Sequence, residues 1–353
     1  QVPADGESRM NRPGKEALDA LLERQDLAED SAYELMVALT DPEMAPAMAG
    51  ALLAALRIKG VTADEVRGFA CAMRSLARRP QIAEGALIAD VVGTGGDGSH
   101  SLNLSTGAAL LASAAGVRIV KHGNRSVSSR SGSADVLEAL GLQLPLDEAA
   151  AGLCLERTGF TFLFAPHYHP AMKAIAPVRA ALGVRTIFNL LGPLANPAQA
   201  PYAVIGAWSL EVARLMAETL AGMEIQRMFV VHGDGGWDEP TPASPFTIFD
   251  VRPGSVRQAK RTAADFGLPV CAEADLKGSD ATHNAMRLAA VLRGEERGAH
   301  RDALLMGAAL VAEVTGLAPD AAGGARLAAT AIDDGRSARL LDGIIAFGRE
   351  RAA

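Results

Sequence analysis

The chain has 353 residues, of which 49% are hydrophobic, 21% charged and 4% aromatic. This composition excludes a disordered, collagen-like or low-complexity protein, and the length suggests two domains or one large α/β domain with an appendage. Lysine and arginine number 34 against 41 for aspartate and glutamate, so the formal charge is −7 and a general nucleic-acid binder is not expected.

The three cysteines, Cys71, Cys154 and Cys271, lie far apart among apolar neighbours. They are expected to be buried thiols rather than disulfides or zinc ligands. No stretch approaches the ~20 uninterrupted apolar residues of a membrane span, and the N-terminus lacks the apolar core of a signal peptide. These features predict a cytoplasmic protein without a membrane partner.

Residues 16–76 have helical periodicity, which predicts a small unit of about four helices. Two segments in it match the capping-box pattern, beginning at Ser31 and at Thr62, each followed three residues later by Glu. Gly60 is expected to end the helix that precedes the second of them.

The pattern changes at residues 88–92, an apolar run that predicts a buried strand followed directly by a glycine-rich turn. Further strands are expected to alternate with helices, which is typical of crossover connections and a largely parallel sheet. These strands are residues 117–120, 160–163, 203–206 and 228–231. Later segments are an exposed irregular or hairpin stretch at 240–253 and alanine-rich helices at 284–292, 302–314 and 324–333.

The glycine-rich turn at residues 93–98, Gly-Thr-Gly-Gly-Asp-Gly, satisfies the dinucleotide pattern G-x-G-x-x-G. A dinucleotide site also needs an acidic residue about 20 positions later, but no Asp or Glu occurs from Gly98 through Ala134. That window instead holds cations and hydroxyls: Arg118, Lys121, Arg125, Arg130, Ser101, Ser105, Thr106, Ser126, Ser128, Ser129, Ser131 and Ser133. Backbone N–H groups, hydroxyls and cations together predict a phosphate-binding site, aided by a helix that is expected to begin near Ser105.

Several long motifs resemble the anthranilate phosphoribosyltransferase family, and the likeness runs from about residue 16 to about residue 348. The motifs are GTGGDG at 93–98, NLST at 103–106, KHGNRSVSS at 121–129, SGSAD at 131–135, HPAMK at 169–173, APVR at 176–179, RTIFNLLGPL at 185–194 and DE at 238–239. The sequence departs from the family pattern beside the last motif, at Trp237, Pro240 and Ser244.

The resemblance implies a helical domain made of residues 14–86 and 167–188, and an α/β domain made of residues 87–166 and 189–353. The α/β domain would have a mostly parallel, mixed sheet, in the architecture shared by nucleoside phosphorylases and these phosphoribosyltransferases. It also implies a homodimer that binds 5-phosphoribosyl 1-diphosphate (PRPP) with magnesium, as two ions, in the cleft between the domains. The reaction is phosphoribosyl transfer to the amine of anthranilate, in tryptophan biosynthesis. An amidotransferase subunit of anthranilate synthase is a further partner that the resemblance allows and the sequence leaves open.

The resemblance also assigns roles to residues. The PRPP-binding residues are Gly93, Gly96, Asp97, Ser101, Asn103, Ser105, Thr106, Lys121 and Ser133. The anthranilate-binding residues are Gly93, His122, Asn124 and Arg179. The metal ligands are Ser105, Asp238 and Glu239, whose hard oxygen atoms suit Mg²⁺. No acid or base is needed, because an aryl amine is already neutral, and Lys121 acts electrostatically.

Three alternatives stay open on the sequence. One is a phosphoribosyltransferase for another aromatic amine, which the sequence separates least well. Another is an enzyme like a pyrimidine nucleoside phosphorylase, which Asn124, Arg179 and the Asp238–Glu239 pair disfavour. The last is an inactive paralogue that binds nucleic acid, which the net negative charge disfavours.

Overall fold

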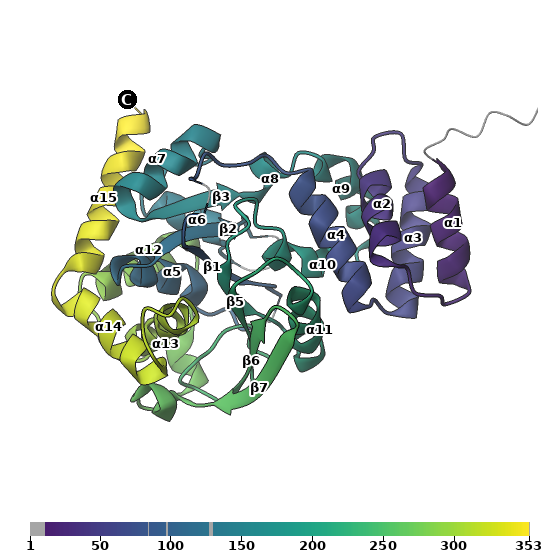
Figure 1. Ribbon diagram of the computed structural model, residues 1–353. Helices are drawn as coiled ribbons and strands as arrows, with labels where there is room; N and C mark the ends of the chain where they lie inside the picture. The colour runs from purple at the N-terminus through teal and green to yellow at the C-terminus, as the bar shows by residue number, and fades with distance from the viewer. Residues whose placement is uncertain (1–10, 84, 97, 127–129, 353) are drawn as a thin grey trace, which may run out of the picture. The chain divides into compact units, whose positions relative to one another are not determined.

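The computed structural model describes residues 11–83, 85–96, 98–126 and 130–352 (Figure 1). Asp97, predicted to bind PRPP, lies outside these residues. The chain divides into two compact units. A helical unit contains the residues up to Arg78 together with Tyr168–Pro197, and an α/β unit contains Arg79–His167 and Ala198–Ala353.

The helical unit consists of short helices with apolar faces. They are α1 (Asn11–Leu22), α2 (Glu29–Leu39), α3 (Pro46–Lys59), α4 (Ala63–Ser75), α9 (Met172–Leu182), α10 (Phe188–Leu191) and η1 (Gly192–Leu194). The capping box at Thr62 is confirmed, since its hydroxyl accepts from the Glu65 amide and the Glu65 carboxylate accepts from the Thr62 amide. Gly60 ends α3 with a φ of +87°, as expected. The box at Ser31 is wrong, because α2 already begins at Glu29, where acidic residues favour the helix N-terminus.

The second segment of the helical unit runs to Pro197 rather than to residue 188, and the first ends at Arg78 rather than at residue 86. Packing accounts for the longer second segment. The Phe188 ring meets Phe69 edge-on at 6.3 Å between centroids, and the Arg74 guanidinium donates to the Leu194 carbonyl at 2.7 Å. The segment around α10 and η1 is thus fixed to α4.

His169 makes the free energy of unfolding depend on pH. Its side chain is 4% exposed, and burial lowers its pKa from 6.5 to about 4. Between those values the unfolded chain binds more protons than the folded chain, so stability falls as the pH drops from 6.5 to 4. We expect this group to cost about 3 kcal/mol by pH 4, a loss that His169→Asn should remove. Denaturant unfolding of the wild type and of His169→Asn at pH 7, 5 and 4 measures this loss of stability. The same pH dependence in the wild type and the variant would show that His169 is not its cause.

The α/β unit has one seven-stranded sheet in the order β3-β2-β1-β4-β5-β6-β7 (Figure 1). The strands are β1 (Ile88–Gly93), β2 (Arg118–Gly123), β3 (Phe160–Phe164), β4 (Tyr202–Gly206), β5 (Arg227–Gly233), β6 (Phe246–Arg252) and β7 (Ser255–Arg261). The first five are parallel and confirm the predicted strands, whereas β6 and β7 extend the sheet antiparallel. For the segment 240–253, the hairpin alternative was correct but its exposure was wrong, because Phe246, Ile248 and Phe249 are buried.

Helices of the α/β unit follow the strands. They are α5 (Leu104–Ala114), α6 (Ser133–Ala139), α7 (Glu148–Thr158), α8 (Ala165–Tyr168), α11 (Leu210–Ala221), η2 (Ala263–Phe266), η3 (Glu273–Leu276), α12 (Ala281–Leu292), α13 (Ala299–Val314), α14 (Ala321–Asp333) and α15 (Arg336–Ala352). The helix α5 packs on β1 and β2, and α11 packs on β5, β6 and β7. The three predicted C-terminal helices are confirmed as α12, α13 and α14, and α15 was not predicted. Among the described residues, no helix is long and apolar enough to cross a membrane.

The three cysteines are free thiols, as expected. Only Cys154 is fully buried, and burial raises its pKa to about 11. The other two are half-buried, so the expectation of burial was correct only for Cys154.

Candidate active site

Three loops leave the sheet at the carboxyl ends of its parallel strands. We call residues 93–103 the first loop, residues 123–132 the second loop and residues 233–245 the acidic loop; they follow β1, β2 and β5. Parallel strands end at a common edge, which is the usual position of a ligand site in such sheets. The fold therefore brings to one edge most of the residues for which PRPP and metal binding are predicted.

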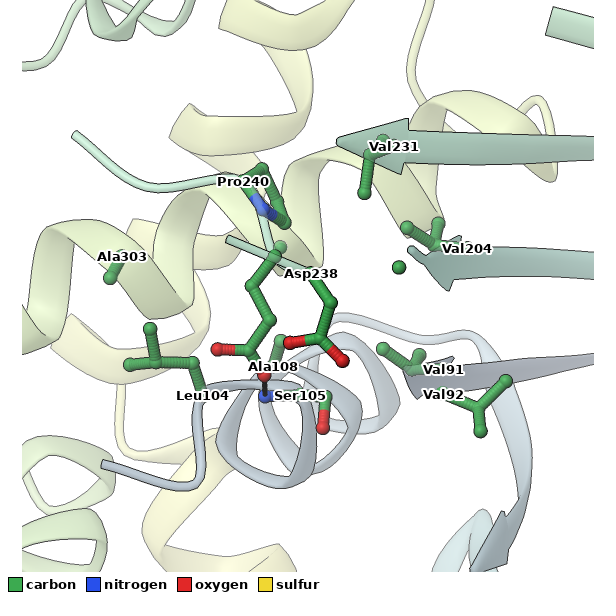
Figure 2. A pocket seen from close by; sticks show the side chains of 13 residues that line it. Val91, Val92, Leu104, Ser105, Ala108, Val204, Val231, Asp238, Pro240 and Ala303 are labelled. Atoms are coloured by element: carbon green, nitrogen blue, oxygen red, sulfur yellow. Dashed lines mark hydrogen bonds between the residues drawn. The ribbon is translucent and has the colours of Figure 1, made fainter. Parts of the chain in front are cut away.

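Asp238 and Glu239 in the acidic loop accept hydrogen bonds from the backbone of the first loop and of α5. An Asp238 carboxylate oxygen accepts from the Gly95 amide at 2.6 Å, and a Glu239 oxygen accepts from the Ser105 amide at 2.8 Å. Figure 2 shows the Asp238 carboxylate and the Ser105 side chain near the ends of the strands that carry Val91 and Val204. The Ser105 amide lies in the first turn of α5, where the free N–H groups of a helix favour anions.

Two glycines make this approach of the acidic loop possible. A Cβ atom on Gly93 would lie 2.5 Å from an Asp238 carboxylate oxygen, and one on Gly206 would lie 1.5 Å from the Asp238 carbonyl oxygen. The cavity that remains beside the two carboxylates has a volume of about 20 Å³, which suits a water or a single ion rather than a sugar diphosphate. A larger ligand would have to lie against the surrounding loops.

Asn103 joins the first and second loops. Its side-chain amide donates to the Ser131 carbonyl at 3.1 Å, and its side-chain oxygen accepts from Asn284 at 2.8 Å. Asn284 is almost fully buried, and its own oxygen accepts from the Ser279 amide at 2.7 Å. The two loops are therefore adjacent and fixed to the start of α12.

The second loop is organised by Asp135 in the first turn of α6. Its carboxylate accepts from the backbone amides of Ser126 at 3.1 Å and Gly132 at 2.9 Å, and from the Arg125 guanidinium at 3.1 Å. These bonds lower the pKa of Asp135 against the opposing effect of burial. A Cβ atom on Gly132 would lie 2.3 Å from the Ser126 nitrogen, so the two ends of this loop meet where only glycine fits.

Lys121 lies in the interior between β1 and β2 and is 2% exposed. Its ammonium group donates to the Val91 carbonyl. Burial lowers its pKa, an effect that the carboxylates of Asp90, Glu239 and Asp238 partly offset. Three carboxylates therefore favour the charged form of this one buried ammonium group.

The other predicted PRPP-binding residues differ in exposure. Gly96 is exposed, with a φ of +73°, and Ser101 is half-buried beside Ser99. Thr106 is fully buried, and its hydroxyl has no hydrogen-bond partner among the described residues. The Ser133 hydroxyl donates to the Asn124 carbonyl at 3.2 Å.

The residues predicted to bind anthranilate are divided between the two units. Gly93, His122 and Asn124 belong to the α/β unit, where His122 is buried and Asn124 is exposed. Arg179 belongs to the helical unit, on α9, and its guanidinium lies 5.0 Å from the centroid of the Phe188 ring. Burial lowers its pKa, which makes an anionic partner more favourable.

The acidic loop contains the three departures from the family pattern, and both of its carboxylates keep their hydrogen bonds. Trp237 is buried, and its carbonyl accepts from the Gly233 amide at 2.8 Å. The Ser244 hydroxyl donates to the Asp234 carbonyl at 3.0 Å, a bond that glycine could not make. Pro240 lines the small cavity (Figure 2). Of the three departures, Ser244 therefore adds a side-chain hydrogen bond within the loop.

The donor set fits magnesium. Two adjacent carboxylates and the Ser105 hydroxyl offer hard oxygen atoms at one place. In the part of the chain that the structure describes, no three His, Cys, Asp or Glu side chains gather as a metal cage. Magnesium is commonly held by one or two carboxylates together with substrate phosphates and waters, so a cage is not required.

Some residues that shape the site were not predicted from the sequence. Asp90 is a charged residue within an apolar strand, which was a signal, and it is buried beside Lys121. Asp135 appeared in a family motif without a role. Gly206 and Asn284 gave no local signal, because their roles depend on contacts distant in sequence.

Comparisons with known proteins show which family the chain belongs to. Residues 85–338 match a glycosyl transferase family α/β domain, and residues 15–77 match the helical bundle domain of the same family. The anthranilate phosphoribosyltransferase of Chloroflexus aurantiacus J-10-fl is 44% identical over 336 residues, covering 95% of this chain and 98% of that protein. The chain belongs to the anthranilate phosphoribosyltransferase family. It is therefore an enzyme that transfers the phosphoribosyl group of PRPP to anthranilate, in tryptophan biosynthesis.

Further members of the anthranilate phosphoribosyltransferase family support the assignment. The Desulforudis audaxviator enzyme is 45% identical and covers 94% of this chain and 96% of its own. The crystal structure of the Thermus thermophilus enzyme is 42% identical with a TM-score of 0.88, covering 94% of this chain and 99% of its own. A Saccharomyces cerevisiae enzyme described in complex with PRPP and Mg shares the fold at a TM-score of 0.88 and 24% identity, covering 97% of this chain and 100% of its own.

Proposed function

We propose that this enzyme holds PRPP as a magnesium complex against the first and second loops and the acidic loop. The observation that carries the proposal is the hydrogen bonding of Asp238 and Glu239 to the amides of Gly95 and Ser105. These bonds support the proposal because they hold two carboxylates beside the first loop and the start of α5, and carboxylates together with substrate phosphates are common ligands of magnesium. The Asn103 side chain connects the first loop to the second loop at Ser131.

The chemistry requires little beyond positioning and electrostatics. The lone pair of the anthranilate nitrogen forms a bond to ribose C1, the bond from C1 to the pyrophosphate oxygen breaks, and the amine releases a proton to water. Since an aryl amine is neutral at pH 7, no general base is needed. The difficult step is the departure of pyrophosphate while positive charge develops on the sugar. Backbone amides and cations aimed at the leaving oxygens lower that barrier.

The proposal gives individual residues the roles that the family resemblance implies. Gly93, Gly96, Asp97, Ser101, Asn103, Ser105, Thr106, Lys121 and Ser133 form the PRPP site, and Lys121 supplies fixed positive charge. Ser105, Asp238 and Glu239 hold magnesium, as two ions. Bound magnesium would neutralise the diphosphate charge as it leaves. Gly93, His122 and Asn124 contact anthranilate together with Arg179, whose planar guanidinium suits a carboxylate.

Replacing Arg179 by alanine should weaken anthranilate binding selectively. Loss of a charge-assisted bidentate contact should raise KM for anthranilate by about 10-fold to 100-fold. The KM for PRPP should stay within about threefold, and Lys173→Ala, which removes an exposed cation on the same helix, should change neither. Steady-state kinetics with each substrate varied in turn measures this. An equal rise in both KM values for Arg179→Ala would remove the assigned role.

The assembly and location follow the family. We expect a homodimer in the cytoplasm, which sedimentation of the purified protein and cell fractionation would test. Docking of an amidotransferase subunit of anthranilate synthase is tested by co-sedimentation with that subunit. Sedimentation as a monomer at working concentration would contradict the expected dimer.

The alternative substrates are separated by one assay. Anthranilate fluorescence is followed after addition of PRPP with and without Mg²⁺, beside a control with thymidine and phosphate. We expect a magnesium-dependent loss of fluorescence and no phosphorolysis. Turnover of another arylamine at a higher kcat/KM than anthranilate, or release of thymine, would favour the corresponding alternative.

A further inference from the structure

The backbone ladder between the neighbouring strands β1 and β2 ends before the strands do. Their parallel pairing stops at Ala89 and Ile119. Yet β1 stays paired with β4 as far as Gly93, and β2 stays paired with β3 as far as Gly123. The ladder between β1 and β2 is therefore interrupted over the residues that lead into the first and second loops.

Two buried side chains connect β1 and β2 where the ladder is interrupted, one from each strand. From β1, an Asp90 carboxylate oxygen accepts from the His122 amide at 3.2 Å. From β2, the Lys121 ammonium group donates to the Val91 carbonyl. Both charged side chains belong to residues that are 2% exposed. They satisfy backbone groups that a continuous ladder would otherwise pair, which buried backbone groups require.

This substitution costs stability. Burying a carboxylate and an ammonium group is unfavourable, whereas ordinary ladder bonds would satisfy the same backbone groups without that cost. What the two side chains provide instead is a link between β1 and β2 beyond the last ladder pair, near the strand ends from which the two loops start. Asn103 links the loops again further along, at Ser131.

We propose that Asp90 is a positioning residue that sets the spacing between the first and second loops. Its carboxylate accepts from the His122 amide and so fixes the β2 backbone there, directly beside Lys121 in the sequence. Asp90 acts through Lys121 and His122 and need not touch substrate. The role rests on the proposal that these loops hold PRPP.

Two variants of Asp90 and one control test this. Asp90→Asn keeps an oxygen that accepts from the His122 amide but removes the charge, and Asp90→Ala removes both. Glu65→Gln is the matched control, since Glu65 is a fully buried carboxylate in the helical unit that accepts from the Leu27 amide at 2.9 Å. For each protein, PRPP binding with Mg²⁺ is measured by calorimetry, together with kcat, both KM values and the thermal midpoint.

We expect Asp90→Ala to raise both KM and Kd for PRPP by about 10-fold to 100-fold, because displaced loops bind the diphosphate less well. The KM for anthranilate should rise less. Asp90→Asn should recover part of the loss. Glu65→Gln should lower the thermal midpoint while leaving PRPP binding within about twofold. If Asp90→Ala fails to fold, a rise of at least about threefold in Kd for Asp90→Asn supports the role.

Unchanged PRPP binding in whichever Asp90 variant folds, or an equal rise in both KM values, would overturn the inference. A double variant of the proposed metal ligands, Asp238→Asn with Glu239→Gln, separates this inference from the proposed PRPP site itself. If that double variant loses PRPP binding while the Asp90 variants do not, only the positioning role fails. If that double variant binds PRPP normally, the proposed site fails.

Discussion

The double variant Asp238→Asn, Glu239→Gln should lose about 1,000-fold in kcat/KM for PRPP, the largest loss that we expect from any substitution in this protein. Each replacement keeps an oxygen that can accept from the Gly95 or Ser105 amide, so the loops should retain their positions. What disappears is the negative charge that binds the cation. Steady-state kinetics across a range of Mg²⁺ concentrations measures the loss, and extra metal should restore part of it.

The control for that variant lies in the same loop. Asp234 has a partly exposed carboxylate that pairs with Lys260 at 2.8 Å, and only its backbone takes part in closing the loop. Asp234→Asn should therefore leave kcat/KM within about twofold, since surface ion pairs contribute little. Wild-type turnover in the double variant would remove Asp238 and Glu239 as metal ligands.

Replacing Gly206 by alanine should abolish most activity by a steric route. The added Cβ atom would lie 1.5 Å from the Asp238 carbonyl oxygen, so the backbone of the acidic loop must move away from the ends of β1 and β4. A displacement of about 1 Å at such a site can cost about 100-fold in rate, and we expect at least that loss in kcat/KM. Kinetics and thermal unfolding of the purified variant measure it.

Gly192→Ala is the matched control, because nothing lies within 4 Å of the position of its added Cβ atom and its backbone is already helical, with a φ of −48°. It should keep wild-type activity and a thermal midpoint at least as high. A Gly206→Ala enzyme as active as Gly192→Ala would show that the acidic loop tolerates displacement, and the geometric account of the site would be wrong.

Local patterns were sufficient to predict the core of the fold. The five parallel strands are short apolar runs, and their alternation with helices implied crossover connections. The antiparallel strand β7 was missed because its sequence, SVRQAKR, is polar and almost fully exposed at the sheet edge. The capping box at Ser31 failed since the same residue types that cap helices also occur inside a first turn.

The candidate site was only partly accessible from the sequence. The run without acidic residues pointed to phosphate, and the family motifs pointed to Asp238 and Glu239. The partners of those carboxylates, the amides of Gly95 and Ser105, are over 130 positions away in the chain, and no spacing rule predicts such a contact. The role of Gly206 appears only when the acidic loop is folded against it.

The most direct measurement is a crystal structure of the enzyme soaked with PRPP and Mg²⁺. The account predicts that the diphosphate lies against the first and second loops, with the metal held by its oxygens and by the carboxylates of Asp238 and Glu239. A diphosphate bound away from the first and second loops, or a metal bound without either carboxylate, would contradict it.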